Sequence, residues 1–364
     1  MRAAVRHALP MIAMTAGVVA LQLVISAADR QFYMTQLVMA LYYTIVVMGL
    51  CLVMGYAGQV SLGHGGFFAL GGYTSAILTT RNLAAHLRPE TLQTLERIGL
   101  LWSRTDLYGA PLATLAPWPA FVAALLLTGA VALILGFPAL RLKGHYLAMA
   151  TLGFGLIVYR MLLGSAFTGY ADGITGVPPW RLAPGVTVSG AMDNRIVNYY
   201  IACGFLLFVL WFLRNLTGSR HGRALRSIHD SETAAKAMGV NTPRLKLQAF
   251  VISAVLAAAA GSFLTHFNGG IGPSEADAMK SVRYLTLVAA GGMANIWGAM
   301  GVSLALTFLS LRGVFGVYDH AVFGGLLIVI VSVAPNGPGR WVADLLRRRR
   351  PTVRSSGAAA EPAT

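Results

Sequence analysis

The chain has 364 residues, of which 56% are hydrophobic and only 11% are charged, and its net charge is +15. This composition argues against a water-soluble domain, because apolar runs of about 20 residues recur and each can cross a bilayer core. The basic residues stand at the ends of these runs and in the C-terminal tail, which is typical of membrane topology and not of nucleic-acid binding. Cys51 and Cys203 lie inside apolar runs and predict neither a disulfide framework nor a metal site.

The apolar runs predict an all-α, polytopic integral membrane protein with about ten transmembrane helices, in one domain over residues 1–336. The first run follows Arg2 and Arg6, and the small residues at its end leave a cleaved signal peptide over 1–28 open. In chain order the runs cover residues 8–28, 34–55, 60–80, 118–137, 145–164, 196–216, 247–267, 284–293, 297–315 and 320–335.

Lysine and arginine set the expected orientation, because cytoplasmic loops carry an excess of both. With the N-terminus inside, residues 56–59, 138–144 and the basic loop 217–246 are cytoplasmic. The basic tail 337–364, expected to be disordered, is cytoplasmic as well. Reaching that side from the outer loop 273–283 takes an odd number of crossings, so the short run 284–293 either crosses as a truncated helix or is re-entrant.

Two outer loops are long. The pattern of residues 81–117 permits an amphipathic surface helix around 91–101, and we read the loop either as a surface insertion or as a docking surface. Residues 166–195 are rich in glycine and proline and are expected to be irregular.

Several motifs of energy conversion and catalysis are missing from the sequence. All thirteen Asp and Glu lie outside the ten runs, whereas ion-coupled transporters need an intramembrane carboxylate. No G-x-x-x-x-G-K-[ST] loop is present, and the histidines near the span ends, His64, His145, His266 and His320, lack E-x-x-H spacing. If the protein moves solute uphill, the energy enters through another polypeptide.

A charged island, residues 220–239, interrupts the apolar sequence and predicts two short helices. Asp230 and Ser231 suit an N-cap, Glu232 suits the first turn of a helix, and Gly239 suits a C-terminal stop. Small residues between them, including Ala234 and Ala235, would allow close docking of a partner. The alternative is a solvated basic loop that only sets the membrane orientation.

Residues 49–72 are one-third glycine, which predicts helices in close contact. Within this segment Tyr56, Gln59, Ser61 and His64 cluster near a predicted break. These four side chains either take part in packing or line a solute path or gate, and the two roles are compatible.

Five motifs in order across residues 49–301 together resemble the branched-chain amino acid ABC permease family, of the LivM type. They read GYAGQVSLGHGGFFALGGY at 55–73, LRLKGHYLAMATLGFG at 140–155, DGITGVPP at 172–179, GRALRSIHDSETAAKAMGV at 222–240 and AGGMANIWG at 290–298. Two positions depart from the pattern, since Cys51 and Leu156 stand where a polar residue is common in the family.

The resemblance implies one permease subunit of an importer in a bacterial inner membrane, built on the type II plan. It further implies a second permease, two cytoplasmic ATPases that bind ATP and magnesium, and a periplasmic solute-binding protein. The alternatives are the same frame carrying urea, amides or aromatic acids, or a passive channel or membrane enzyme. The expected ATPase-coupling residues are Arg223, Arg226, Ser231, Glu232, Ala234, Ala235 and Gly239, and the expected translocation path includes Tyr56, Gln59, Ser61, His64, Asp172 and Thr175.

Overall fold

The computed structural model describes residues 2–27, 31–82, 94, 96–105, 111–140, 142 and 144–333. A helix occupies each of the ten apolar runs. The helices are α1 (Arg2–Ala27), α2 (Phe32–Cys51), α3 (His64–Thr80), α5 (Pro117–Ala139), α6 (His145–Gly164), α7 (Arg195–Gly218), α10 (Thr242–Asn268), α11 (Ala278–Gly291), α12 (Ile296–Leu311) and α13 (Asp319–Val333).

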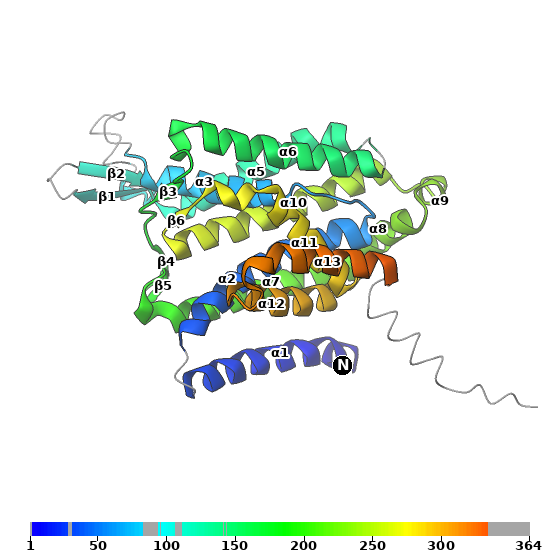
Figure 1. Cartoon of the computed structure of the whole chain (residues 1–364), viewed down its shortest axis with the longest axis horizontal. Helices are drawn as coiled ribbons and strands as arrows, with labels where there is room; N and C mark the ends of the chain where they lie inside the picture. Colours follow the sequence, from blue (N-terminus) through cyan, green and yellow to red (C-terminus); the bar gives the residue numbers. More distant parts are fainter. Residues whose placement is uncertain are drawn as a thin grey trace, which may run out of the picture.

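The long helices lie side by side, with their axes roughly aligned across the molecule (Figure 1). Two short helices, α8 (Arg220–Asp230) and α9 (Glu232–Ala237), stand together at one end, which we call the α9 end. The strands gather at the opposite end, which we call the strand end. They are β1 (Leu101–Thr105), β2 (Pro111–Leu115), β3 (Ile174–Thr175), β4 (Trp180–Ala183), β5 (Val186–Val188) and β6 (Gly270–Ile271).

Five helical segments of the described chain are long and apolar enough to cross a membrane: Phe32–Tyr56, Pro117–Ala139, His145–Gly164, Met192–Gly218 and Thr242–Asn268. Helices α11, α12 and α13 have only 14, 16 and 15 residues. The protein is therefore a multi-pass helical membrane protein, while a total of ten crossings stays a prediction.

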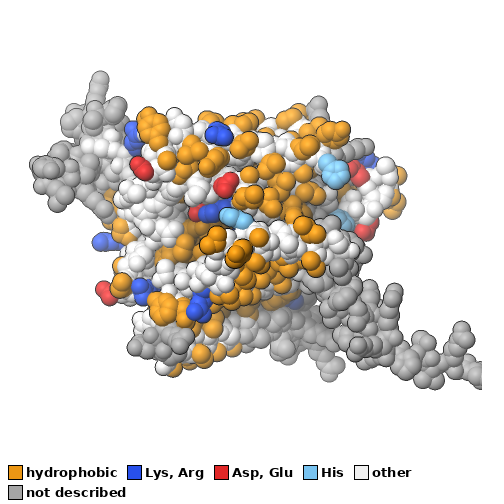
Figure 2. Space-filling model, viewed as in Figure 1, with side chains coloured by type: hydrophobic (Ala, Val, Ile, Leu, Met, Phe, Trp, Pro, Cys, Tyr) orange, Lys and Arg blue, Asp and Glu red, His pale blue; other side chains and the backbone are white. Residues whose placement is uncertain are grey.

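Helix α2 forms the centre of the bundle. It is buried along nearly its whole length and is surrounded by α7, α10, α11 and α12. The outer helices α5 and α6 instead expose large apolar side chains, such as Ile134 at 75% and Met161 at 67%. Figure 2 shows how much apolar surface this leaves on one face of the molecule. An apolar exterior is what a bilayer requires, because lipid tails solvate it.

Glycines let α3 and α10 approach each other closely, as the glycine-rich sequence predicts. A Cβ on Gly71 would lie 2.4 Å from the Cα of Ala258, and one on Gly261 would lie 2.1 Å from the Phe68 carbonyl oxygen. No larger side chain fits at either contact without moving the backbone. The pair thus forms a tightly packed unit inside the bundle.

The two outer loops differ in part from the predictions. Residues 94, 96 and 97 are helical, in agreement with the helix predicted around 91–101. That helix does not extend to Leu101, which starts strand β1 and pairs antiparallel with β2, from Leu101 opposite Leu115 to Thr105 opposite Pro111. Residues 91–93 and 95 of that prediction lie outside the described residues. The segment 166–195 contains β3, β4 and β5 and is not wholly irregular, because β3 pairs with β6 and β4 pairs with β5. The tail 337–364 also lies outside the described residues.

Candidate functional site

Helix α8 begins where the chain turns out of α7 at the α9 end. The Ser219 hydroxyl caps it by accepting a hydrogen bond from the Gly222 amide at 3.4 Å. A Cβ on Gly222 would come within 2.3 Å of the Thr217 carbonyl oxygen, so this reversal needs glycine. Leu225 and Ile228 face the bundle, whereas Arg223 is exposed. The helix is thus amphipathic and covers this end of the molecule.

Helix α9 follows after one residue, and its ends form as the sequence predicts. Ser231 is the N-cap, and its hydroxyl accepts from the Ala234 amide at 3.3 Å. After the helix Gly239 takes φ +80°, a left-handed conformation that favours glycine. The two alanines differ, because Ala235 is buried and Ala234 is exposed. Met238 is 84% exposed. Ala235 therefore anchors the helix and does not belong to its free surface.

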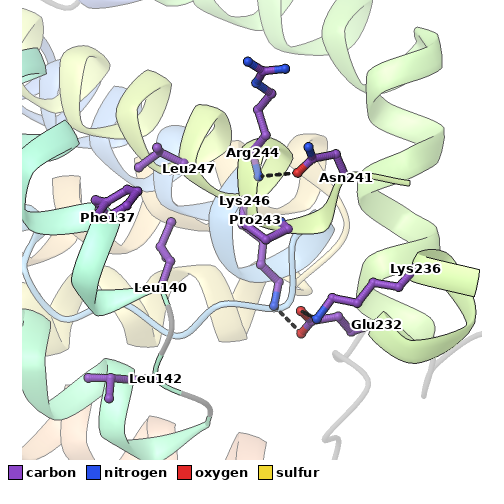
Figure 3. A pocket seen from close by; sticks show the side chains of 11 residues that line it. Phe137, Leu140, Leu142, Glu232, Lys236, Asn241, Pro243, Arg244, Lys246 and Leu247 are labelled. Carbon is purple, nitrogen blue, oxygen red and sulfur yellow. Dashed lines mark hydrogen bonds and ion pairs between the residues drawn. The ribbon is translucent and has the colours of Figure 1, made fainter. Parts of the chain in front are cut away.

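Glu232 joins α9 to the start of α10 (Figure 3). Its carboxylate pairs with Lys246 of α10 at 2.5 Å and with Lys236 of α9 at 3.0 Å, and the Thr242 hydroxyl donates to it at 3.2 Å. The hydrogen bond from Lys246, with help from Lys236, lowers the pKa of Glu232 to about 2. This carboxylate is ionised at neutral pH and is already paired within the chain. The sequence predicted Glu232 but missed Lys246 and Thr242, which carry no local signal for the pairing.

A pocket of about 620 Å³ opens beside this ion pair, between α9, the start of α10 and the α5–α6 connection. Glu232, Lys236, Lys246 and Arg244 form its polar side, whereas Phe137, Leu140, Leu142 and Leu247 form its apolar side (Figure 3). A groove that combines exposed apolar side chains with fixed charges is suited to receiving a protein partner.

The predicted break separates α2 from α3 and packs against α8. The last turn of the α2 segment is a π-helix, η1 (Leu52–Tyr56), and residues 58–63 are not helical. Such π-helical turns often mark functional positions. The Arg226 guanidinium lies 5.2 Å from the centre of the Tyr56 ring, a cation–π contact. A Cβ on Gly58 would lie 3.0 Å from Nδ1 of His229. Helix α8 is thus in direct contact with the break.

The polar residues of the break are buried, and His64 and the Leu62 amide bond to other helices. Ser61 and His64 lie 3.2 Å apart, and Nε2 of His64 lies 2.6 Å from the Ser253 hydroxyl of α10. The Thr151 hydroxyl of α6 accepts from the Leu62 amide at 2.9 Å. Gln59 is 3% exposed, and its side-chain oxygen has no hydrogen-bond partner among the described residues. All four predicted residues of the break, Tyr56, Gln59, Ser61 and His64, are therefore buried.

Asp172 and Thr175 are not part of this cluster. Thr175 belongs to β3 and pairs with Gly270 of β6 at the strand end, and both predicted residues are exposed. The structure therefore divides the predicted path residues between two ends. The two departures from the family pattern also differ in setting, since the Cys51 thiol donates to the Met293 carbonyl oxygen at 3.3 Å and Leu156 faces outward from α6 at 47% exposure.

Comparison with known proteins decides the family. The model of the permease component of the branched-chain amino acid transport system matches residues 32–331. The chain belongs to this family.

Several curated members of the permease family are similar over most of the chain. The high-affinity branched-chain amino acid transport permease LivM of Salmonella typhimurium is 29% identical over 82% of this chain and 68% of its own length. BraD of Pseudomonas aeruginosa, a permease of the same description, is 27% identical over 84% and 95%. LivH of Salmonella typhimurium is 24% identical over 81% and 90%. No solved structure matches. Members of the family are transporter subunits and not enzymes, in agreement with the sequence.

Proposed function

We propose that this chain is one permease subunit of an ABC importer and forms half of a translocation pathway for branched-chain amino acids or a similar small polar solute. ATP hydrolysis in partner subunits drives it through the loop 220–239. The observation that carries the proposal is the link from the exposed face of α9, through Glu232 and Lys246, into α10. The family membership supports the importer frame, and the sequence lacks an energy source of its own.

The link explains how a push on α9 would reach the membrane. Displacing α9 drags the start of α10, because the ion pair from Glu232 to Lys246 at 2.5 Å and the hydrogen bond from Thr242 tie them together. Helix α10 cannot slide freely against α3, since Gly71 and Gly261 interlock the two helices. The two helices then move as a unit, as alternating access by rigid bodies requires.

A second contact joins α8 to the break between α2 and α3. Arg226 covers Tyr56, and His229 packs on Gly58. Moving α8 would shift both contacts and disturb the buried Gln59, Ser61 and His64 behind them. We therefore propose that the break is the gate on the α9 side and that the α9 end faces the cytoplasm, beside the ATPases.

The remaining partners follow from the proposed importer. A related system in one organism includes both LivM and LivH permeases, which supports pairing of this chain with a second permease. The binding protein would deliver solute at the strand end, where Asp172, Thr175 and the β1–β2 hairpin of the 81–117 loop are found.

The test uses an exposed α9 residue, since changing Glu232 would also break the link within the chain. Met238→Arg places a charge on the docking face, at a side chain that is 84% exposed. Met192→Arg is the matched control, because Met192 is 75% exposed and precedes α7 at the opposite end. We expect Met238→Arg to lose co-purifying ATPase subunits and labelled leucine uptake, with normal amounts of folded permease.

The control variant should keep its ATPase subunits. If Met238→Arg binds the ATPase subunits fully, α9 is not part of the docking site. If deletion of the whole chain leaves leucine uptake unchanged, the solute is not leucine. The importer assignment would then be tested with other solutes.

A further inference from the structure

A cluster of four charged side chains lies beside the start of α11, at the meeting point of α2, α11, α12 and α13. Glu275, in the turn η4 (Pro273–Ala276), pairs with Lys280 at 2.5 Å. Arg283 contacts both Asp319, the first residue of α13, and the Ser310 hydroxyl of α12. All four charged side chains are 15–26% exposed. Figure 2 shows acidic, basic and histidine side chains close together near the middle of a mostly apolar face.

The lengths of the helices place this cluster about half-way along the bundle. The turn after α11 lies beside η1 near the α9 end, because Cys51 donates to the Met293 carbonyl oxygen and a Cβ on Gly55 would overlap it. Helix α11 has 14 residues and α10 has 27, so at 1.5 Å per residue α11 extends about 21 Å from that end and α10 about 40 Å. Lys280 and Arg283 therefore lie near mid-depth, where unsolvated charge is costly.

The cluster borders a small pocket of about 100 Å³ that is lined by Tyr43, Lys280, Arg283, Tyr284, Thr307 and two leucines. Tyr284 is 2% exposed and Thr307 is 3% exposed, yet neither hydroxyl has a hydrogen-bond partner among the described residues. Buried hydroxyls are nearly always hydrogen-bonded, so two without a partner on one pocket wall leave hydrogen-bonding capacity for a bound water or ligand.

The wall offers donors to an anionic group. The Tyr284 and Thr307 hydroxyls line the pocket together with two cations, each of which is also paired with a carboxylate, Lys280 with Glu275 and Arg283 with Asp319. The Tyr43 hydroxyl donates to Glu275 at 3.1 Å and holds that carboxylate in place. The volume is enough for a carboxylate head group.

We propose that this pocket binds the carboxylate of an amino-acid-like solute during its passage, with Lys280, Arg283, Tyr284 and Thr307 as the contacting residues. The inference rests on the proposed importer function and adds a solute site to it. No signal in the sequence marks this site, because its residues come from loops and span ends that are far apart in the chain.

The test removes only the two hydroxyls, in the variant Tyr284→Phe/Thr307→Val. The matched control is Tyr42→Phe/Thr128→Val, which removes two other buried hydroxyls that have no partner among the described residues and lie outside the pocket. Both variants are purified as the assembled importer with its ATPases. Thr307→Val alone is measured alongside, in case the double variant assembles poorly.

Binding is read from the Tm of the purified complex, without binding protein, in millimolar leucine or leucinamide. We expect leucine to raise the Tm of the wild type and the control variant, and leucinamide to leave it unchanged because it lacks the carboxylate. The pocket variant should lose the response to leucine. Transport at saturating binding protein should fall about tenfold or more, the usual effect of losing a hydrogen bond to a charged group.

Three results would overturn the site: an equal response to leucine and leucinamide, no response in the wild type, or a full response in the pocket variant. Deletion of the whole chain separates this test from that of the function. If deletion abolishes leucine uptake while the pocket variant transports normally, the importer assignment stands and the pocket is rejected.

Discussion

Breaking the pair between Glu232 and Lys246 should release α9 from α10. One pKa unit corresponds to about 1.4 kcal/mol, so lowering the pKa of Glu232 from 4.5 to about 2 corresponds to about 3 kcal/mol for all its partners together. The Glu232 side chain is 28% exposed, and solvent screening reduces the share of Lys246 to about 1–2 kcal/mol. The variant Lys246→Met keeps the apolar stem and removes only the charge.

A loss of this size changes the open fraction of α9 by a factor of about 5–30. Hydrogen exchange, followed by mass spectrometry on the purified permease, should therefore quicken by that factor at the amides of residues 235–240. Lys236→Met is the matched control, because Lys236 is 53% exposed and its pair spans a single helical turn, worth only about 0.3–0.5 kcal/mol. Equal exchange in the two variants, or unchanged exchange in Lys246→Met, would refute this account of the link.

The other predictions concern pH and helix packing. Because the pKa of Glu232 is lowered on folding, its stabilisation is complete above pH 4.5 and is lost as the pH falls toward 2, so the exchange protection of residues 235–240 should decline in that window in the wild type but hardly in Lys246→Met. If the exchange protection of residues 235–240 falls equally steeply with pH in Lys246→Met, another group causes the pH effect. Gly71→Ala should lower the Tm of the purified protein, because its Cβ would lie 2.4 Å from the Cα of Ala258, and such overpacking costs about 1–3 kcal/mol. Gly153→Ala is the control, since nothing lies within 4 Å of a Cβ there, and an equal loss of Tm in both variants would contradict the packing argument.

Features that depend on neighbouring residues were readable from the sequence alone. The apolar runs located the helices, because each must satisfy its own backbone hydrogen bonds in lipid. Ser231 and Gly239 marked the ends of the α9 segment, since capping is a matter of a few consecutive residues. The glycines of residues 49–72 indicated close packing, although not which helix would be the partner.

Contacts between distant segments were decided only by the tertiary structure. The predicted helix around residues 91–101 ends before Leu101, where β1 begins, because strand pairing depends on a partner that for Leu101 lies 14 residues away. Only the structure shows that Lys246 is the partner of Glu232. Lys280 and Arg283, predicted in an outer loop, lie near mid-depth in the structure because α11 is shorter than the helices around it. Local propensity acts over a few residues, whereas the pairing of charges and the depth of a pocket depend on how whole helices pack against one another.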